Sequence, residues 1–565
     1  MSRNGIAPEI DAIALRPPGQ VMRLARLGSF HQSRLSFLRV LLRRIDRERW
    51  RFARKRFDID ADGVGTALYT ITAGDRAYTL VAFAHDLPPE KRTDRVIAEA
   101  WDATFVLFDG VPSDDDVARL SHNVPRQEAG RYLRSELVLA RANRSVRLFD
   151  SVVTTLASGR QPDARVLDAV GYLMRTTAVY GNGKFGIADR DVYADRAELA
   201  GPFQAEMLTV WLIRNFTLDL VEHLARLRNP QGAVPLDRAL RRRLGVGNAT
   251  GLGMAPFLVK HPALIDRWIL ARETALARVR SLRAASGRDI DLLHGLVRAA
   301  IAMHAQWTTD DPVQAPRIAQ LRSDLARFLD TVERCRGEDA QRVWNALYVA
   351  AESNLGLEAQ EQIVSLLLEM CPRVVDALAP TMAIDEQLEF SIDGGMRCAA
   401  LCAAIDDQYA WARDVDFAQA AERAKFWYVS EEKLEPRLGE RLMEPGAELE
   451  QPLAVASDVQ RLRDALGAVA PSTTVGRFLL QRPEHRHTVR RVQTTMRHPY
   501  GEIRDNLISA EMRPIDLLRC KLSFFGCTRF DPRSDKWLRI TLFQGAPLPD
   551  EIGHGDWDRW IWGAA

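Results

Sequence analysis

The amino-acid sequence predicts a mainly helical α+β protein, with a large multi-helix body and a small mixed sheet. Between about residues 126 and 520, apolar residues recur at the three-to-four-residue spacing of amphipathic helices. Runs rich in β-branched and aromatic residues occur instead at about 66–108 and again at about 521–543. We expect the N-terminal strands to form the sheet, and the C-terminal strands are the candidates to join it.

Length and composition limit the class of protein. The chain has 565 residues, of which 47% are hydrophobic and 27% charged, as in ordinary globular proteins. Its net charge of +2 argues against a polycation that binds nucleic acid along its whole length. The first thirty residues lack the apolar core of an export signal, and no long uncharged apolar run predicts a membrane span. We therefore expect a cytoplasmic protein. Its length predicts several units, which we place at 1–57, 58–125, 126–380 and 381–565.

The first unit is a loose leader followed by a basic helical stretch over residues 21–57. Residues 1–57 contain 14 basic and 4 acidic side chains, and the densest run is 43–56. Such a run can bind nucleic acid or an acidic partner. It can equally be a solvated helix face whose arginines pair with acidic residues of the remaining chain, and we favour this second interpretation.

The strand and helix signals follow in order along the chain. Two β-rich runs flank Ala73-Gly74-Asp75-Arg76, which predicts a hairpin, and a third apolar strand precedes Asp109-Gly110. Late strands are expected at 521–525 and 537–543. Helices are expected at 128–159, 202–228, 262–284, 288–307, 314–336 and 340–370.

Two glycine-rich segments interrupt the helical pattern, at 180–190 and 245–262. A helix connection commonly needs one glycine, whereas repeated glycines let a ligand approach bare backbone N–H groups. Neither segment matches the dinucleotide-binding or phosphate-loop fingerprint. The segments are either a shared site for an anionic small molecule or a phosphate-bearing cofactor, or two tight helix junctions.

Lysine placement favours the shared site. Only eight of the 77 basic residues are lysines, and Lys184 and Lys260 both fall in these segments. Lysine can lose its proton and act as a base, which arginine does not do. Lys184 is the expected cation or base, Lys260 and His261 support it, and Asp189 orients a neighbouring cation. The expected ligand-binding residues are Tyr180, Gly181, Asn182, Gly183, Gly186, Gly247, Asn248, Thr250, Gly251, Gly253 and Arg397.

A third cluster of titratable residues lies at 497–506. His498, Tyr500 and Glu502 supply the acid and base groups that proton transfer uses, provided that this segment folds back onto the other two. His485 and His487 lie two residues apart, and on a helix their side chains would point in different directions. We therefore predict no metal site there.

Three functional hypotheses follow. The first is a cytoplasmic enzyme of unknown reaction and unknown cofactor that binds a small anionic molecule at the glycine-rich segments. The alternative is a helical interaction or scaffold protein that binds nucleic acid or an acidic partner through residues 43–56. The third is a homo-oligomer closed by the aromatic tail at 557–562.

Overall fold

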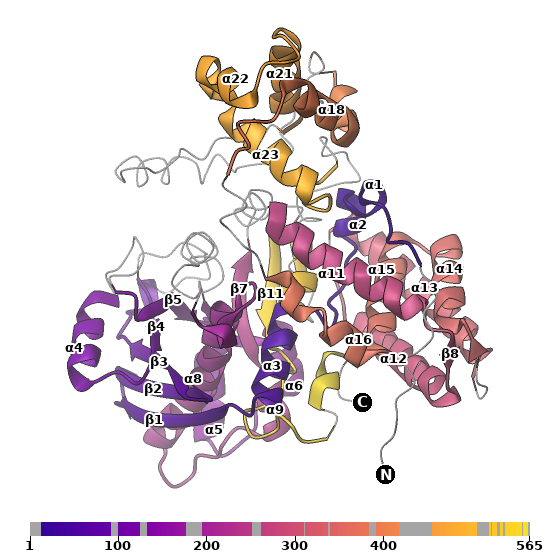
Figure 1. Ribbon diagram of the computed structural model, residues 1–565. Coiled ribbons are helices and arrows are strands. Elements are labelled where there is room, and N and C mark those ends of the chain that lie inside the picture. Colours follow the sequence, from indigo (N-terminus) through magenta and orange to yellow (C-terminus); the bar gives the residue numbers. More distant parts are fainter. Residues whose placement is uncertain are drawn as a thin grey trace, which may run out of the picture.

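The computed structural model confirms a mainly helical α+β protein built around one mixed sheet (Figure 1). The residues that the structure describes are 13–91, 100–124, 133–176, 195–250, 262–309, 311–336, 340–383, 391–416, 418, 455–504, 519–520, 522–527, 531–534, 537–555 and 557–562.

The sheet has nine strands in the order β1-β2-β3-β4-β5-β6-β7-β11-β10. The first six strands form an antiparallel meander, β7 runs parallel to β6, and β11 and β10 continue antiparallel. N- and C-terminal strands therefore belong to one sheet, as the sequence indicated. The strands are β1 (Arg51–Ile59), β2 (Gly65–Ala73), β3 (Arg76–Ala84), β4 (Ala103–Asp109), β5 (Glu136–Arg144), β6 (Tyr172–Thr176), β7 (Gly245–Thr250), β10 (Asp531–Ser534) and β11 (Trp537–Leu542).

The predicted hairpin is confirmed between β2 and β3. Ala73 pairs with Arg76 across a two-residue turn, and Gly74 has a φ of 59°, a conformation that glycine adopts without strain. The expected strands before Asp109 and at 537–543 are also present. The expected strand at 521–525 is wrong, because residues 522–526 form a helical turn.

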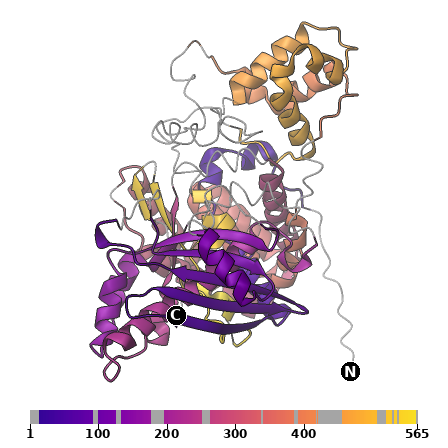
Figure 2. The same cartoon turned by 90° about the vertical axis from the view of Figure 1, so that its left-hand side faces the viewer.

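Two helices cover the sheet from opposite sides. The long helix α8 (Gln204–Arg228) connects β6 to β7 and lies between the sheet and the other helices (Figure 1). Helix α4 (Asp114–Asn123) lies on the outer face, in front of the strands in Figure 2. Val117 and Leu120 of α4 pack there on apolar side chains such as Val81 and Val106. The outer face is therefore apolar where α4 covers it.

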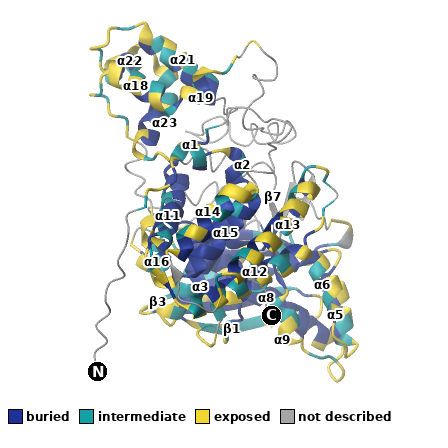
Figure 3. Ribbon diagram, turned by 90° about the vertical axis from the view of Figure 1, so that its right-hand side faces the viewer, coloured by how far each residue is buried: buried dark blue, intermediate teal, exposed yellow. Residues whose placement is uncertain are grey.

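The helical body consists of α11 to α16. Its helix α15 is buried on all sides, as the dark ribbon in Figure 3 shows. The sequence predicted one helix over 340–370, but the chain forms two helices with a break at Leu355-Gly356. The helices are α11 (Pro262–Arg280), α12 (Gly287–Ala305), α13 (Gln314–Glu333), α14 (Val343–Asn354), α15 (Leu357–Glu369) and α16 (Pro372–Asp376), and the short strands β8 (Ala284–Ala285) and β9 (Ala340–Gln341) pair beside them.

Two helical predictions in the N-terminal part are wrong in part. Residues 51–57 were expected to be helical and lie in strand β1. The range 128–159 was expected to be one helix but contains strand β5 before helix α5 (Phe149–Ala157). The other helices of this part are α1 (Pro18–Val21), α2 (Leu24–Leu27), α3 (Phe37–Arg47), α6 (Ala164–Val170) and α9 (Arg238–Arg242).

Residues 391–416 and 455–497 form a helical unit with its own apolar core. This unit lies above the body in Figure 1, and its last helix points toward α1 and α11. Its helices are α18 (Cys398–Gln408), α19 (Ala410–Arg413), α21 (Val455–Gly467), α22 (Val475–Gln481) and α23 (Arg486–Arg497).

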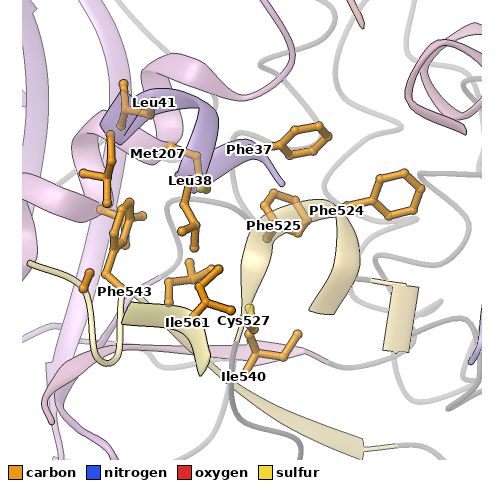
Figure 4. Packing of buried hydrophobic residues seen from close by; sticks show 14 of the residues in the cluster. Phe37, Leu38, Leu41, Met207, Phe524, Phe525, Cys527, Ile540, Phe543 and Ile561 are labelled. Atoms are coloured by element: carbon orange, nitrogen blue, oxygen red, sulfur yellow. The ribbon is translucent and has the colours of Figure 1, made fainter. Parts of the chain in front are cut away.

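The C-terminal part returns to the main core. Phe524 and Phe525 pack near Phe37 of α3, and Ile561 of the aromatic tail lies in the same cluster (Figure 4). Trp557 donates a hydrogen bond from its indole nitrogen to Asp46 Oδ2 at 3.2 Å. The tail thus docks onto its own chain.

No helix in the described part of the chain combines the length and the apolar character needed to cross a membrane.

Candidate functional site

The only parallel strand pair found in the described sheet brings the end of β6 next to the end of β7. β6 and β7 run side by side, and Thr176 at the end of β6 lies opposite Asn248 of β7. Residues 177–194 follow β6 directly, and residues 251–261 follow β7 directly. The ends of β6 and β7 therefore lie at the same edge of the sheet, and helix α8 lies between these two strands in the chain.

Most residues of the predicted site lie outside the described residues. These are Tyr180, Gly181, Asn182, Gly183, Lys184, Gly186, Asp189, Gly251, Gly253, Lys260 and His261.

The second segment begins as a strand, which corrects the expectation of an irregular loop from residue 245 onward. A Cβ on Gly245 would lie 2.3 Å from the carbonyl oxygen of Leu542 in β11, so this glycine permits close strand packing. A Cβ on Gly247 would lie 2.8 Å from the ring of Tyr172. Both glycines thus have a structural reason within the sheet.

Asn248 is the predicted ligand-binding residue that the structure describes best. Its side chain is buried, and its Nδ2 donates to the backbone oxygen of Thr176 at 3.5 Å. The amide therefore ties the ends of β6 and β7 together. Thr250 is the last residue of β7 and pairs with Leu538 of β11.

Polar side chains occupy the outer face of the sheet toward this edge. Thr104 lies opposite Arg141 across β4 and β5, and Asn143 lies opposite Arg175 across β5 and β6. Directly opposite residues, and alternate residues of one strand, share a face. His85, which follows β3, joins them through a 2.8 Å contact between its Nε2 and Thr104 Oγ1. Beyond the apolar area under α4, this face therefore carries arginine and hydrogen-bonding side chains, of which Thr104 and Asn143 are buried.

These side chains are held in place by their neighbours. Asn143 Oδ1 accepts a hydrogen bond from the backbone nitrogen of Asp102 at 2.9 Å, and the Arg141 guanidinium lies 5.8 Å from the ring centre of Trp101. Burial lowers the pKa of His85, and the Asp102 carboxylate opposes this in part. The neutral form of His85 is therefore favoured, and in that form the ring can accept a proton.

The third predicted cluster contacts the start of α11, the helix that follows residues 251–261. His498 Nδ1 lies 3.1 Å from Asp266 Oδ2, and the backbone nitrogen of Tyr500 donates to Asp266 Oδ1 at 2.9 Å. A Cβ on Gly501 would lie 2.7 Å from the carbonyl oxygen of Pro262. The segment 498–501 is therefore packed onto the first turns of α11.

The remaining predicted residues have structural partners or lie in the helical unit. Tyr500 donates from its hydroxyl to the backbone oxygen of Arg16 at 2.6 Å. Glu502 is buried and accepts from Arg491 through both oxygens, each at 2.6 Å. Arg397 is exposed at the start of α18, and its backbone forms a bridge to Thr474.

The basic run 43–56 is divided between helix α3 and strand β1. Several of its arginines bind acceptors within the chain, whereas Arg49 and Arg51 are exposed. Arg43 is largely buried and forms an ion pair with Asp376 at 3.3 Å, and Arg54 pairs with Asp219 at 3.0 Å. These contacts agree in part with the expected pairing to acidic residues of the remaining chain, but the run is not one helix face.

The residues that sequence reasoning missed are those on the outer face of the sheet. His85, Thr104, Arg141, Asn143 and Arg175 are distributed over four segments, and only strand pairing brings them together. Alternation of polar and apolar residues along β5 was the available signal, but its alanine, leucine and arginine residues also favour a helix. Among the described residues, no group of His, Cys, Asp and Glu is arranged to hold a metal ion.

Comparison with protein-family models, with curated proteins and with solved structures finds no match to this chain.

Proposed function

We propose that the protein is an enzyme that binds a small anionic molecule, such as a phosphate or carboxylate compound, at the edge where β6 and β7 end. One observation supports the proposal: Thr176 lies opposite Asn248 in a parallel pair, so the strands that precede residues 177–194 and 251–261 end next to each other. Ligands of open sheets commonly bind beyond the carboxyl ends of parallel strands where the topology changes.

The chemistry of the described surroundings supports an anion. Arg141 and Arg175 share the outer face with the hydrogen-bonding groups of Thr104 and Asn143. Guanidinium groups bind phosphate and carboxylate oxygens through two parallel hydrogen bonds. In this proposal Lys184 and Lys260 complete the cationic surroundings from the two segments.

Proton transfer in this proposal uses lysine first. Lys184 acts as the base or the principal cation, with Lys260 and His261 in support. His498 is the best placed member of the third cluster, because it contacts α11 near the start of that helix. Tyr500 and Glu502 instead hold other parts of the chain in position.

Ligand binding is tested on the purified full-length protein. Mass spectrometry of the molecules released on denaturation identifies a retained ligand, and thermal unfolding with inorganic phosphate and pyrophosphate measures binding. We expect an increase in melting temperature that Lys184→Ala and Lys260→Ala each reduce. Lys55→Ala is the matched control, because Lys55 is exposed on β1 at the opposite end of the strand order. Equal melting shifts in all four proteins would contradict the proposal.

The base role is tested separately by conservative substitution. Lys184→Arg keeps the charge and removes the amine that titrates. We expect this variant to keep the phosphate-induced melting shift and to lose turnover of the released ligand or its precursor. Full turnover by Lys184→Arg would leave Lys184 only the role of a cation.

A further inference from the structure

The segment formed by α22, the following turn and α23 has a charge unlike the rest of its unit. Residues 475–500 contain six arginines and one glutamate. The other helices of the unit carry paired charges, as for Arg463 with Asp406 at 2.9 Å and Arg413 with Asp406 at 3.0 Å. Positive charge is therefore concentrated at one end of the unit.

The arginines of this segment lie at the surface. Arg477, Arg482, Arg486 and Arg497 are exposed, and Arg490 is half-buried. No described carboxylate forms an ion pair with Arg477, Arg482 or Arg497. This differs from the body, where exposed arginines commonly have partners, such as Arg336 with Asp291 at 2.8 Å.

One face of α23 carries the charge and the other faces carry the packing. At 100° per residue, Arg486, Arg490 and Arg497 fall within a narrow sector of the helix. Val489 and Val492 point into the core of the unit instead. Arg491 lies on a third side, where it binds Glu502.

The local architecture is a helix, a short turn and a second helix. Four residues, 482–485, separate α22 from α23. Phe478 of α22 shares the core with Val489 and Val492, and its ring stacks on His485 of the turn at a centroid distance of 5.7 Å. The turn is therefore fixed by packing. A turn of this length also joins the two helices of the helix-turn-helix motif, whose second helix enters the major groove of DNA.

The body leaves the N-terminal half of α23 accessible. His498, just beyond the C-terminal end of α23, contacts Asp266 of α11, so that end faces the body (Figure 1). Arg482, Arg486 and Arg490 lie at the other end. In DNA-binding proteins of this type the N-terminal residues of the second helix contact the bases. At about 1.5 Å per residue, the 12 residues of α23 form a rod of roughly 18 Å, and a major groove about 12 Å wide admits a helix.

We propose that residues 391–416 and 455–497 form a DNA-binding unit that places the N-terminal half of α23 in the major groove of duplex DNA. Arg486 and Arg490 contact the groove, and Arg477 and Arg482 bind the flanking phosphates. This role does not depend on the site at the edge of the sheet.

Binding is measured by fluorescence anisotropy with the full-length protein and a labelled duplex of about 20 base pairs, which spans about two helical turns. The test variant combines Arg482→Ala, Arg486→Ala and Arg490→Ala. The control variant combines Arg413→Ala, Arg461→Ala and Arg463→Ala, which changes the net charge equally within the same unit. Circular dichroism and thermal unfolding check that both variants fold.

We expect the wild-type protein to bind the duplex at about 50 mM salt and to lose affinity steeply as salt rises. Loss of three phosphate or groove contacts should weaken binding at least tenfold and reduce the slope of log affinity against log salt by about 2–3. The control variant should stay close to the wild type. Absence of duplex binding at low salt, or equal affinity of the two variants, would overturn the proposal. Equally tight binding of polyglutamate at the same charge concentration would also overturn it, because it would indicate an acidic protein partner.

Discussion

Helices α15 and α23 use charge in opposite ways. α15 is buried, and its carboxylates are each bound by arginines from distant segments: Glu361 by Arg16, Arg26 and Arg272, and Glu369 by Arg39. α23 carries several arginines at the surface. A buried charge is costly unless it is paired, whereas an exposed charge stays hydrated at little cost. Arginines from other segments therefore stabilise the buried carboxylates of α15, whereas those on α23 have, in our proposal, a role in recognition.

The contacts of Glu361 join the basic N-terminal part of the chain to the helical body. Three guanidinium nitrogens lie 2.6–2.7 Å from its oxygens. Burial alone would raise the pKa of Glu361, but Arg16, Arg272 and Arg26 hold it well below the usual range. The carboxylate therefore stays ionised and ties α15 to α11 and to the N-terminal segment.

The largest expected effect comes from removing this carboxylate. Glu361→Ala leaves buried guanidinium groups with too few carboxylates, which typically costs about 3–5 kcal/mol of unfolding free energy. Glu484→Ala on the exposed turn before α23 is the control and should change stability by less than about 0.5 kcal/mol. Urea unfolding followed by circular dichroism measures both. Similar urea midpoints for the two variants would contradict the proposed difference between the buried ion pairs of α15 and the exposed charges near α23.

The second largest expected effect is a loss of folding stability in mild acid, caused by His304, which contacts helix α15. His304 is fully buried, and its Nε2 lies 2.8 Å from Gln362 Oε1. Burial lowers the pKa of His304 to about 4, although Gln362 and Glu358 oppose this. Burial also lowers the pKa of the neighbouring His31, and the positive charges of Arg519 and Arg272 add to this.

The sign follows from proton binding. Between about pH 6.5 and 4 the unfolded chain binds a proton at residue 304 that the folded chain does not, so stability falls as pH falls. One such histidine should cost about 2 kcal/mol between pH 8 and pH 5. His304→Gln should flatten this part of the stability curve, whereas His122→Gln on the exposed end of α4 should leave it unchanged. An unaltered curve for His304→Gln would contradict the assignment.

The smallest expected effect is on the stability of α23 variants. Arg486→Ala and Arg490→Ala together should change the unfolding free energy by less than about 0.5 kcal/mol, because Arg486 is exposed, Arg490 is half-buried and neither belongs to the apolar core. The same thermal and urea measurements apply. A loss of unfolding free energy above about 2 kcal/mol would show that these arginines stabilise the fold, and it would weaken the contrast with α15.

Local sequence signals predicted the elements that are long and periodic. Helices α8, α11, α12 and α13 match the expected ranges closely, and the hairpin at Gly74 follows from its turn residues. The sequence failed at β5, because its alanine, leucine and arginine residues also favour helix, and its strand conformation depends on pairing with β4 and β6.

The site was predictable only as a set of residue types. The glycines of β7 have low strand propensity, and neighbouring strands rather than local sequence make this segment a strand. The adjacency of the ends of β6 and β7 depends on a pairing between residues 172–176 and 245–248, which are far apart in sequence. The partners of α15 are equally remote, since Arg16 and Glu361 are separated by 345 positions.

Cross-linking tests the central claim, that the segments after β6 and β7 form one anion site, most directly. The chain has only eight lysines, so a short amine-reactive cross-linker gives few products, which mass spectrometry resolves. We expect an intramolecular link between Lys184 and Lys260 whose yield falls when pyrophosphate is added. Modification of both lysines without any link between them, or a yield that pyrophosphate leaves unchanged, would contradict the claim.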